Sequence, residues 1–196
     1  MNLIDHLEAH CGTIEGGFSA EAEGTVPPVQ VVQLPRGPVP GTAVLSTLGL
    51  SHHVMHSPDS GKKFRIELVM LYRASEGPRN LPGVIQQVVA EALRDHHGLS
   101  RGDVVGPWGP LREGASVEAL YVTGALCFPE SFMVYKPPED GTLPIVMAWL
   151  VPITALEAAF VRRLGGERFE AELDNQNPNL LNLERPPIHL PAEVGR

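Results

Sequence analysis

The chain contains few cysteines and few cations for its 196 residues. Its two cysteines, Cys11 and Cys127, lie far apart in unrelated contexts, so they predict neither a metal-binding pair nor a disulfide-rich scaffold. Lys and Arg together number 15 against 23 Asp and Glu, which gives a formal net charge of -8. This balance argues against nucleic acid or an anionic membrane as the main partner, because both select for clustered Lys and Arg.

A long apolar run is also missing. The longest candidate, residues 143–153, is about half the roughly 20 residues that a membrane-spanning helix needs, and Pro144 and Pro152 interrupt it. The first ten residues carry acids and histidines instead of the basic and apolar regions of a secretory signal. The sequence therefore predicts no membrane anchor and a cytoplasmic protein whose two cysteines are reduced.

Sequence motifs of cofactor binding are absent as well. The 20 glycines never fall in the spacing of a P-loop or of a dinucleotide-binding turn. Ser46 and Ser51 lie near Gly49 but outside any G-x-S-x-G pattern, so neither is identified as an activated nucleophile. We expect no cofactor and predict that the chain is not an enzyme.

Three histidines form the one cluster that suggests metal chemistry: His52, His53 and His56. On a helix, His52 and His56 would share a face at a separation suited to a metal ion. Gly49 and the segment 57–61 instead favour a strand exit or loop, and no acid accompanies the histidines as in H-E-x-x-H. We expect no metal here, and a metal-dependent hydrolase that uses these three histidines stays an alternative.

Apolar periodicity predicts alternating strands and helices, and 43% hydrophobic residues suffice for the core of one globular domain. The segments 16–28 and 35–41 are expected to be connectors. The spacing predicts an α/β (α+β) fold, in which helices flank a central mixed, mostly antiparallel sheet. Strands are expected at 29–34, from 42 onward, and at 64–72, 118–123, 131–135 and 143–151; helices are expected after Asn2 and Leu81, and at 155–164 and 167–173.

Six short motifs occur along the chain: Leu45-Ser46-x-x-Gly49-Leu50-Ser51, Phe64-x-x-Glu67-Leu68, Leu81-Pro82, Gly102-Asp103-Val104, Pro110-Leu111 and Val151-Pro-Ile-Thr-x-x-Glu157. In their order and spacing they resemble the Suppressor of fused family in its compact single-domain bacterial type. The likeness covers about 29–183, so we expect one domain over 1–196 with a loosely held tail at 184–196.

The resemblance implies an α/β protein-binding module with no known catalytic centre. In animal members this domain precedes a second one, and the two clasp an extended peptide of a zinc-finger transcription factor by extending a sheet. The chain ends where that second domain would begin, so we do not expect the clasp or the transcription-factor role here. Compact bacterial relatives are proposed to include immunity proteins that neutralise toxins.

Asp103 is the candidate partner-binding residue. The resemblance implies that the acid of the Gly-Asp motif meets the bound peptide. Taken by itself, Asp103 also fits a turn acid that hydrogen-bonds neighbouring backbone amides at the start of a strand. Both interpretations stay open at this point.

The sequence therefore predicts a non-catalytic protein-binding module, and most specifically a bacterial immunity-type protein that binds and neutralises a cognate toxin. An acidic surface would attract a basic toxin domain. A self-associating regulatory or adaptor protein is a further alternative, in which a homodimer forms through an exposed sheet edge.

Overall fold

The computed structural model describes residues 2–19, 28–57, 60–95, 98–139 and 141–191. The chain divides into two compact units, each built from two separate stretches of sequence. Whether the two units form one domain, as the sequence predicts, stays a prediction. Unit 1 consists of Met1–Ser100 and Thr123–Leu150, and unit 2 of Arg101–Val122 and Val151–Arg196.

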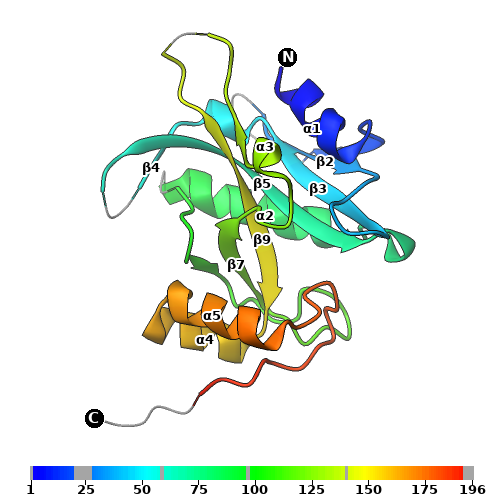
Figure 1. Ribbon diagram of the computed structural model, residues 1–196, viewed down its shortest axis with the longest axis vertical. Coiled ribbons are helices and arrows are strands. Elements are labelled where there is room, and N and C mark those ends of the chain that lie inside the picture. The colour runs from blue at the N-terminus through cyan, green and yellow to red at the C-terminus, as the bar shows by residue number, and fades with distance from the viewer. Residues whose placement is uncertain (1, 20–27, 58–59, 96–97, 140, 192–196) are drawn as a thin grey trace. The chain divides into compact units, whose positions relative to one another are not determined.

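Strands make up the centre of unit 1 (Figure 1). Four of them pair antiparallel in chain order: β1 (Gly16–Ser19), β2 (Gln30–Leu34), β3 (Thr42–Leu48) and β5 (Lys63–Arg73). β5 then pairs in parallel with β9, while β4 pairs with β5 and β8 with β9, both antiparallel. The bounds of these three are Met55–His56 for β4, Val134–Tyr135 for β8 and Ile145–Ile153 for β9.

Unit 2 contains β6 (Val104–Val105), which pairs antiparallel with β7 (Ala119–Gly124). Within unit 1 the strands follow the path β1-β2-β3-β5-β9. With five helices among the described residues, the mixed and mostly antiparallel sheet confirms the predicted fold class.

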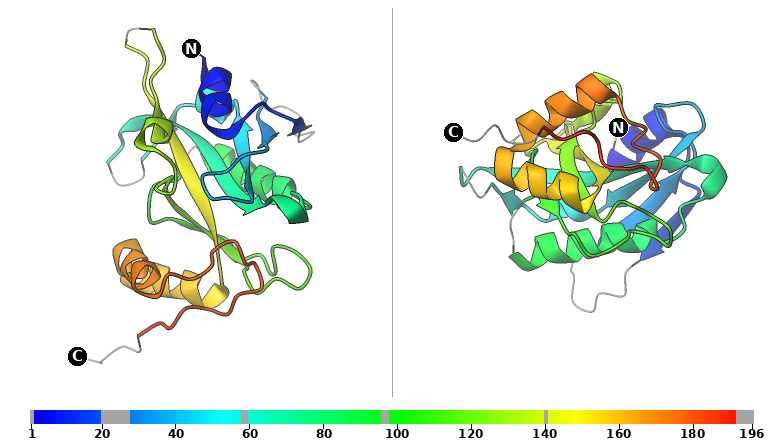
Figure 2. Two further views of the ribbon diagram at one scale, coloured as in Figure 1. Left: turned by 45° about the vertical axis from the view of Figure 1, so that its right-hand side comes forward. Right: turned by 90° about the horizontal axis from the view of Figure 1, so that it is seen from below.

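The strand β5 forms the core of unit 1. Ile66, Leu68 and Met70 are at most 2% exposed, and the neighbouring positions Val69 and Leu71 are buried as well. A strand flanked by partners on both edges and buried on both faces needs an apolar run such as residues 68–71. Two helices of this unit, α1 (Leu3–Cys11) and α2 (Leu81–Asp95), lie on opposite sides of the strands (Figure 2).

Two sequence predictions for unit 1 were wrong. Residues 131–135 were expected to be a strand, but α3 (Glu130–Met133) precedes the two-residue β8. Phe132 is fully buried and stacks on Phe128 with ring centroids 4.1 Å apart, so tertiary packing overrides local strand propensity. Part of the expected connector 16–28 is β1, because β2 supplies its main-chain partners; residues 20–27 lie outside the described part.

Unit 2 packs two helices, α4 (Ala155–Leu164) and α5 (Gly166–Gln176), which lie side by side (Figure 2). The capping box predicted for α4 is present: the Glu157 amide donates to Thr154 Oγ1 at 3.3 Å, and the Thr154 amide donates to Glu157 Oε2 at 2.8 Å. The ring of Phe169 on α5 meets that of Tyr121 edge to face, with centroids 5.1 Å apart.

The described part of the C-terminal segment is bound to unit 2. Arg185 is 4% exposed and forms two hydrogen bonds with Glu157, which is fully buried. The Ile188 amide donates to Glu157 Oε1 at 2.9 Å. The sequence had placed this stretch in a loosely held tail, because a partner 28 residues away leaves no local signal.

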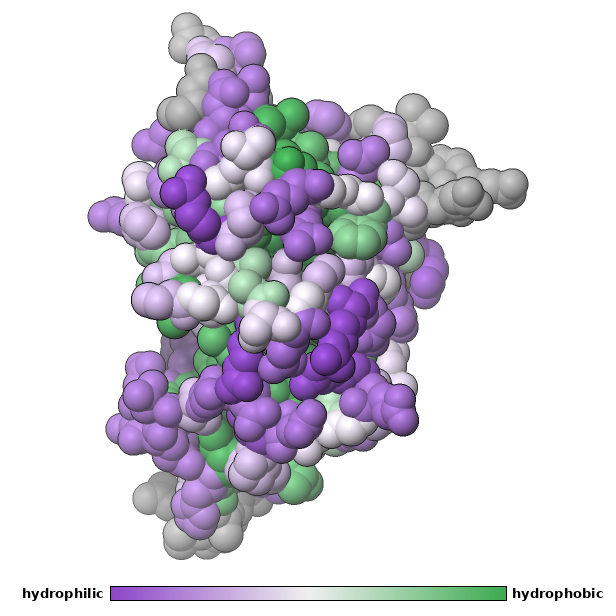
Figure 3. Space-filling model, turned by 90° about the vertical axis from the view of Figure 1, so that its right-hand side faces the viewer, coloured by the Kyte–Doolittle hydropathy of each residue, from purple (hydrophilic) through white to green (hydrophobic). Residues whose placement is uncertain are grey.

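The surface is mixed in character. The face drawn in Figure 3 is largely hydrophilic, with apolar residues in small separate areas. Exposed large apolar side chains include Leu126 and Leu156, at 62% and 64%. Among the described residues, none of the helices combines the length and apolarity needed to cross a bilayer.

Candidate functional site

The first family-like motif is organised around a buried carboxylate in unit 1. Glu67 on β5 is fully buried and accepts three hydrogen bonds. The Thr47 hydroxyl donates at 2.5 Å, and the amides of Gly49 and Ser51 donate at 3.1 and 3.0 Å. Glu67 therefore holds the turn between β3 and the 3-10 helix η1 (Leu50–His52) in place.

Gly49 is required at this turn for two reasons. Its φ of +107° is a conformation that L side chains rarely adopt, and an added Cβ would lie 2.5 Å from the carbonyl oxygen of Pro28. Arg65 Nε donates to the carbonyl of Ser51 at 2.6 Å and fastens the other end of the turn. The motif residues thus have a structural role that accounts for their spacing.

The three predicted metal-ligand candidates follow this turn. His52 ends η1, His53 comes next, and His56 lies in β4 opposite Lys63, so the helical spacing considered for His52 and His56 is not formed. His52 and His56 are exposed. Across the described ranges, no three His, Cys, Asp or Glu side chains are grouped to hold a metal ion.

Both cysteines are free thiols with raised pKa values. Burial raises the pKa of Cys11 to about 12 and that of Cys127 to about 11. Because the thiolate is the reactive form, neither cysteine is activated as a nucleophile near neutral pH.

The second candidate, Asp103, lies in unit 2 at the start of β6 and is half-buried. Its carbonyl accepts from the Val122 amide, and the Gly102 amide donates to the Val122 carbonyl, both at 2.9 Å. These two bonds continue the β6–β7 pairing past Val104 and Tyr121 to Asp103 and Val122. The backbone at Asp103 is therefore held by the sheet.

A hydrogen-bond network that the sequence analysis did not identify lies beside Asp103. Arg101 donates to both carboxylate oxygens of Glu170 on α5, with Nε 3.0 Å from Oε1, and the Tyr121 hydroxyl donates to the same Oε1 at 2.8 Å. Burial, first of all, raises the pKa of Tyr121, and the bond to Glu170 and the charges of Glu170 and Asp103 raise it further. Glu170 also raises the pKa of Arg101. This network, with Asp103, is the Asp103 cluster below: Arg101, Asp103, Tyr121 and Glu170.

Replacement of Gly166 by alanine should disturb this cluster. An added Cβ would lie 2.5 Å from the Tyr121 hydroxyl and 3.0 Å from the Gly102 Cα, and the bond to Glu170 prevents the phenol from moving freely. We expect a loss of about 1–3 kcal/mol in the free energy of unfolding, measured by urea denaturation.

Gly83→Ala is the matched control, because Gly83 is also helical and an added Cβ meets nothing within 4 Å. It should raise stability by about 0.5–1 kcal/mol through the higher helix propensity of alanine. Equal effects of the two substitutions would contradict the steric explanation for Gly166.

The fold and these sites define a mixed α/β protein whose motif residues hold its turns in place. Residues 25–186 match the model of the family described as Suppressor of fused protein (SUFU), and the chain belongs to this family. The family is known as a protein-binding domain without catalytic activity. A search of curated proteins found no significant match.

Solved structures support the same fold. A SUFU homologue from Neisseria gonorrhoeae FA 1090 superimposes with a TM-score of 0.72 at 18% identity, over 96% of this chain and 95% of that one. The Sufu–Fu complex gives 0.64 at 15% identity, over 87% and 82%. Drosophila Suppressor of Fused gives 0.58 at 16% identity, over 81% of this chain and 42% of the fly protein.

Proposed function

We propose that this chain is a non-catalytic, cytoplasmic protein-binding module that neutralises a basic toxin domain. The family match over residues 25–186 carries the proposal. One similar structure is that of a complex between Sufu and Fu, so a relative with this fold engages another protein. The immunity role rests on the resemblance to compact bacterial relatives, and an acidic chain suits it electrostatically.

The Asp103 cluster is the proposed contact surface for the partner. Arg101 satisfies Glu170 in a bidentate ion pair, and Asp103 adds a further negative charge near the phenol of Tyr121. α5 presents a further exposed acid, Glu167. With a net charge of -8, the chain favours a partner rich in Lys and Arg and accelerates its approach at low salt.

An affinity pull-down tests the proposal. The tagged chain is incubated with lysate of its own cells at low and moderate salt, and bound proteins are identified by mass spectrometry. We expect a stoichiometric basic protein whose retention falls at least about tenfold with Asp103→Asn, because a buried charged contact is worth about 1.4 kcal/mol or more. Asp174→Asn, an exposed aspartate of α5, is the matched control and should retain the partner.

Two outcomes would overturn the assignment of this surface: no protein retained at either salt concentration, or equal retention by the Asp103 and Asp174 variants. Co-expression with the identified partner then tests immunity. If the partner is a toxin, the chain should restore growth and Asp103→Asn should not. Light scattering on the same sample tests the alternative of a homodimer.

A further inference from the structure

We propose that His6 is a pH-sensitive latch in unit 1, which holds α1 against α3 and β8 at neutral pH and releases the helix on acidification. The proposal concerns the N-terminal helix and is independent of the partner-binding surface in unit 2. It follows from the way two histidines are built into an aromatic cluster.

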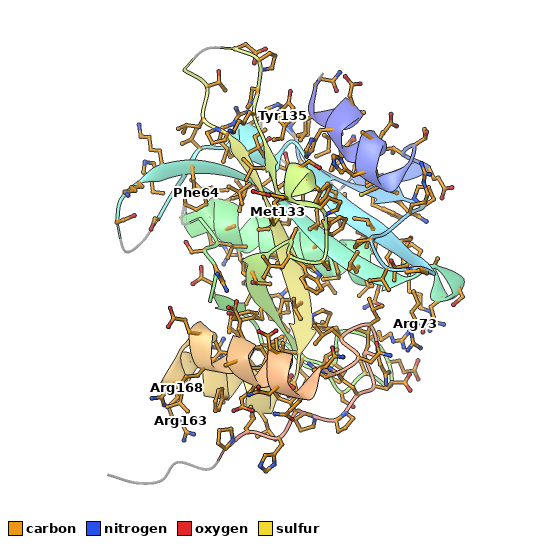
Figure 4. The ribbon with its side chains drawn as sticks, in the orientation of Figure 1. Phe64, Arg73, Met133, Tyr135, Arg163 and Arg168 are labelled. Atoms are coloured by element: carbon orange, nitrogen blue, oxygen red, sulfur yellow. The ribbon has the colours of Figure 1, made fainter. Side chains whose placement is uncertain are left out.

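His6 is 3% exposed and is surrounded by aromatic rings from α3 and β8. Its ring stacks on Phe132 at a centroid distance of 5.7 Å and an angle of 9°, and lies 5.2 Å from the ring of Tyr135. Its Nε2 is 3.0 Å from the Phe132 carbonyl oxygen. Figure 4 labels Met133 and Tyr135 on the short α3–β8 segment that carries these partners.

His10 lies one helical turn later and completes the contact. Its Nδ1 is 2.9 Å from the His6 carbonyl oxygen, and its Nε2 is 3.0 Å from Ser131 Oγ on α3. A carbonyl oxygen can only accept, so His6 Nε2 and His10 Nδ1 must carry the donated protons. In the neutral state, the proton-free nitrogen of His6 is therefore Nδ1.

Protonation of His6 at Nδ1 would place a positive charge in this cluster. The titratable groups that face His6 are His10 on its own helix, 5.0 Å away between ring centroids, and the phenol of Tyr135 on β8. α3 contributes the ring and carbonyl of Phe132. A protonated His10 has the same sign, so it opposes a second charge.

The acidic side chains of α1 accept hydrogen bonds from backbone amides. Asp5 accepts from the Asn2 amide at 2.9 Å, and Glu8 accepts from the Ile14 amide at 2.9 Å. Glu130 at the start of α3 is exposed. Burial lowers the pKa of His6, the bond to Phe132 raises it, and the charge of His10 lowers it, with a lowered pKa as the net result.

The sign of the pH effect follows from this lowered pKa. Docked α1 binds fewer protons at His6 than released α1, whose histidine has the ordinary pKa of 6.5. Docking is therefore complete above pH 6.5 and weakens as the pH falls below it. From pH 7.5 to 5.0, the opening equilibrium can rise up to roughly thirty-fold if His6 stays neutral while docked.

The other end of α1 provides the anchor about which the helix would open. The Gly12 amide donates to the Glu8 carbonyl, and the Arg36 amide donates to the Cys11 carbonyl at 3.0 Å. These main-chain bonds contain no group that titrates near neutral pH. Acidification should therefore free the first turns of α1 and uncover Phe132 and its neighbours Phe128 and Tyr135.

Hydrogen–deuterium exchange of the full chain at pH 7.5 and 5.0, corrected for the intrinsic rates, tests the latch. In the wild type, exchange of residues 3–11 and 130–135 should rise several-fold at pH 5.0, while β3 and β5 stay protected. His6→Gln keeps an N–H that can reach the Phe132 carbonyl but does not titrate, so its exchange should not depend on pH. His52→Gln, at an exposed histidine of the same unit, should behave as the wild type.

Equal protection of residues 3–11 at the two pH values in the wild type would overturn the proposal, as would acid-induced opening that persists in His6→Gln. If the pH effect is lost in His10→Gln but persists in His6→Gln, then His10, and not His6, is the pH-sensitive group. NMR titration of the wild-type imidazoles provides a measurement that needs no variant: a His6 pKa at or above 6.5 refutes the latch.

Discussion

Replacing Arg185 with methionine is expected to lower the free energy of unfolding by about 3–5 kcal/mol, because it leaves the carboxylate of Glu157 buried without its counter-charge. Arg185 Nη1 and Nη2 lie 2.6 and 2.8 Å from the two oxygens of Glu157, in a bidentate pair. Nη2 also donates to the Pro152 carbonyl at 3.2 Å. Urea denaturation followed by circular dichroism measures the loss.

The double variant Glu157→Gln with Arg185→Met removes both charges but keeps one acceptor oxygen for the amides of Thr154 and Ile188, so it should recover part of that loss. Glu184→Gln is the matched control. Glu184 pairs with Arg112 at 3.3 Å, but its side chain is 61% exposed, so this change should stay within about 0.5 kcal/mol. A loss of similar size in Arg185→Met and Glu184→Gln would contradict the role of burial.

The same pair predicts a dependence of stability on acid. Burial alone would raise the pKa of Glu157, but the bonds from Arg185 and from the amides of Thr154 and Ile188 hold it below its usual value of 4.5. The ionised pair therefore stabilises the fold above about pH 4.5, and this contribution is lost as the pH falls through the folded pKa. The double variant should show a flatter stability profile below that pH.

Glu67→Ala should produce a loss of similar size in unit 1, about 3–5 kcal/mol, because three donors would lose their acceptor. The Thr47 hydroxyl and the amides of Gly49 and Ser51 all point at this carboxylate. Hydrogen exchange should show loss of protection at residues 47–52 before the rest of the unit.

Glu67→Gln is expected to be intermediate, since an amide keeps one acceptor oxygen but turns its NH₂ group toward a donor. Glu113→Gln, at an exposed carboxylate in unit 2, is the control and should change stability by less than about 0.5 kcal/mol. If Glu67→Ala unfolds no more easily than Glu113→Gln, the turn does not depend on the buried carboxylate.

Most helices and strands could be predicted from local sequence patterns. The Thr154 and Glu157 capping box, the apolar run of β5 and the helix after Leu81 each depend on residues within a few positions of one another, and the structure contains all three. The order of short motifs led to the family, which the match over residues 25–186 shows. The motif acid Glu67 could be found in this way, although its role in holding a turn could not.

The second role of Glu157, its pairing with Arg185, could not be predicted from a local pattern. Its capping role is local and visible in the sequence, but its pairing with Arg185 joins residues 28 positions apart. The strand predicted at 131–135 was wrong for the same reason, because the helical turn of α3 depends on the burial of Phe132. Strand propensity describes the segment alone and contains nothing about that packing.

By itself, the sequence determined the class of fold, most strands and helices, the family and the acidic character of the chain. The tertiary structure alone decided which distant side chains meet: Arg185 with Glu157, Arg101 with Glu170 at a separation of 69 residues, and His6 with Phe132 at 126. Propensity and periodicity arise from interactions within a turn or between adjacent residues, so a short stretch of sequence is enough to predict a helix or a strand. A buried pair of distant residues forms only when the chain folds, and no local sequence pattern predicts which residues will meet.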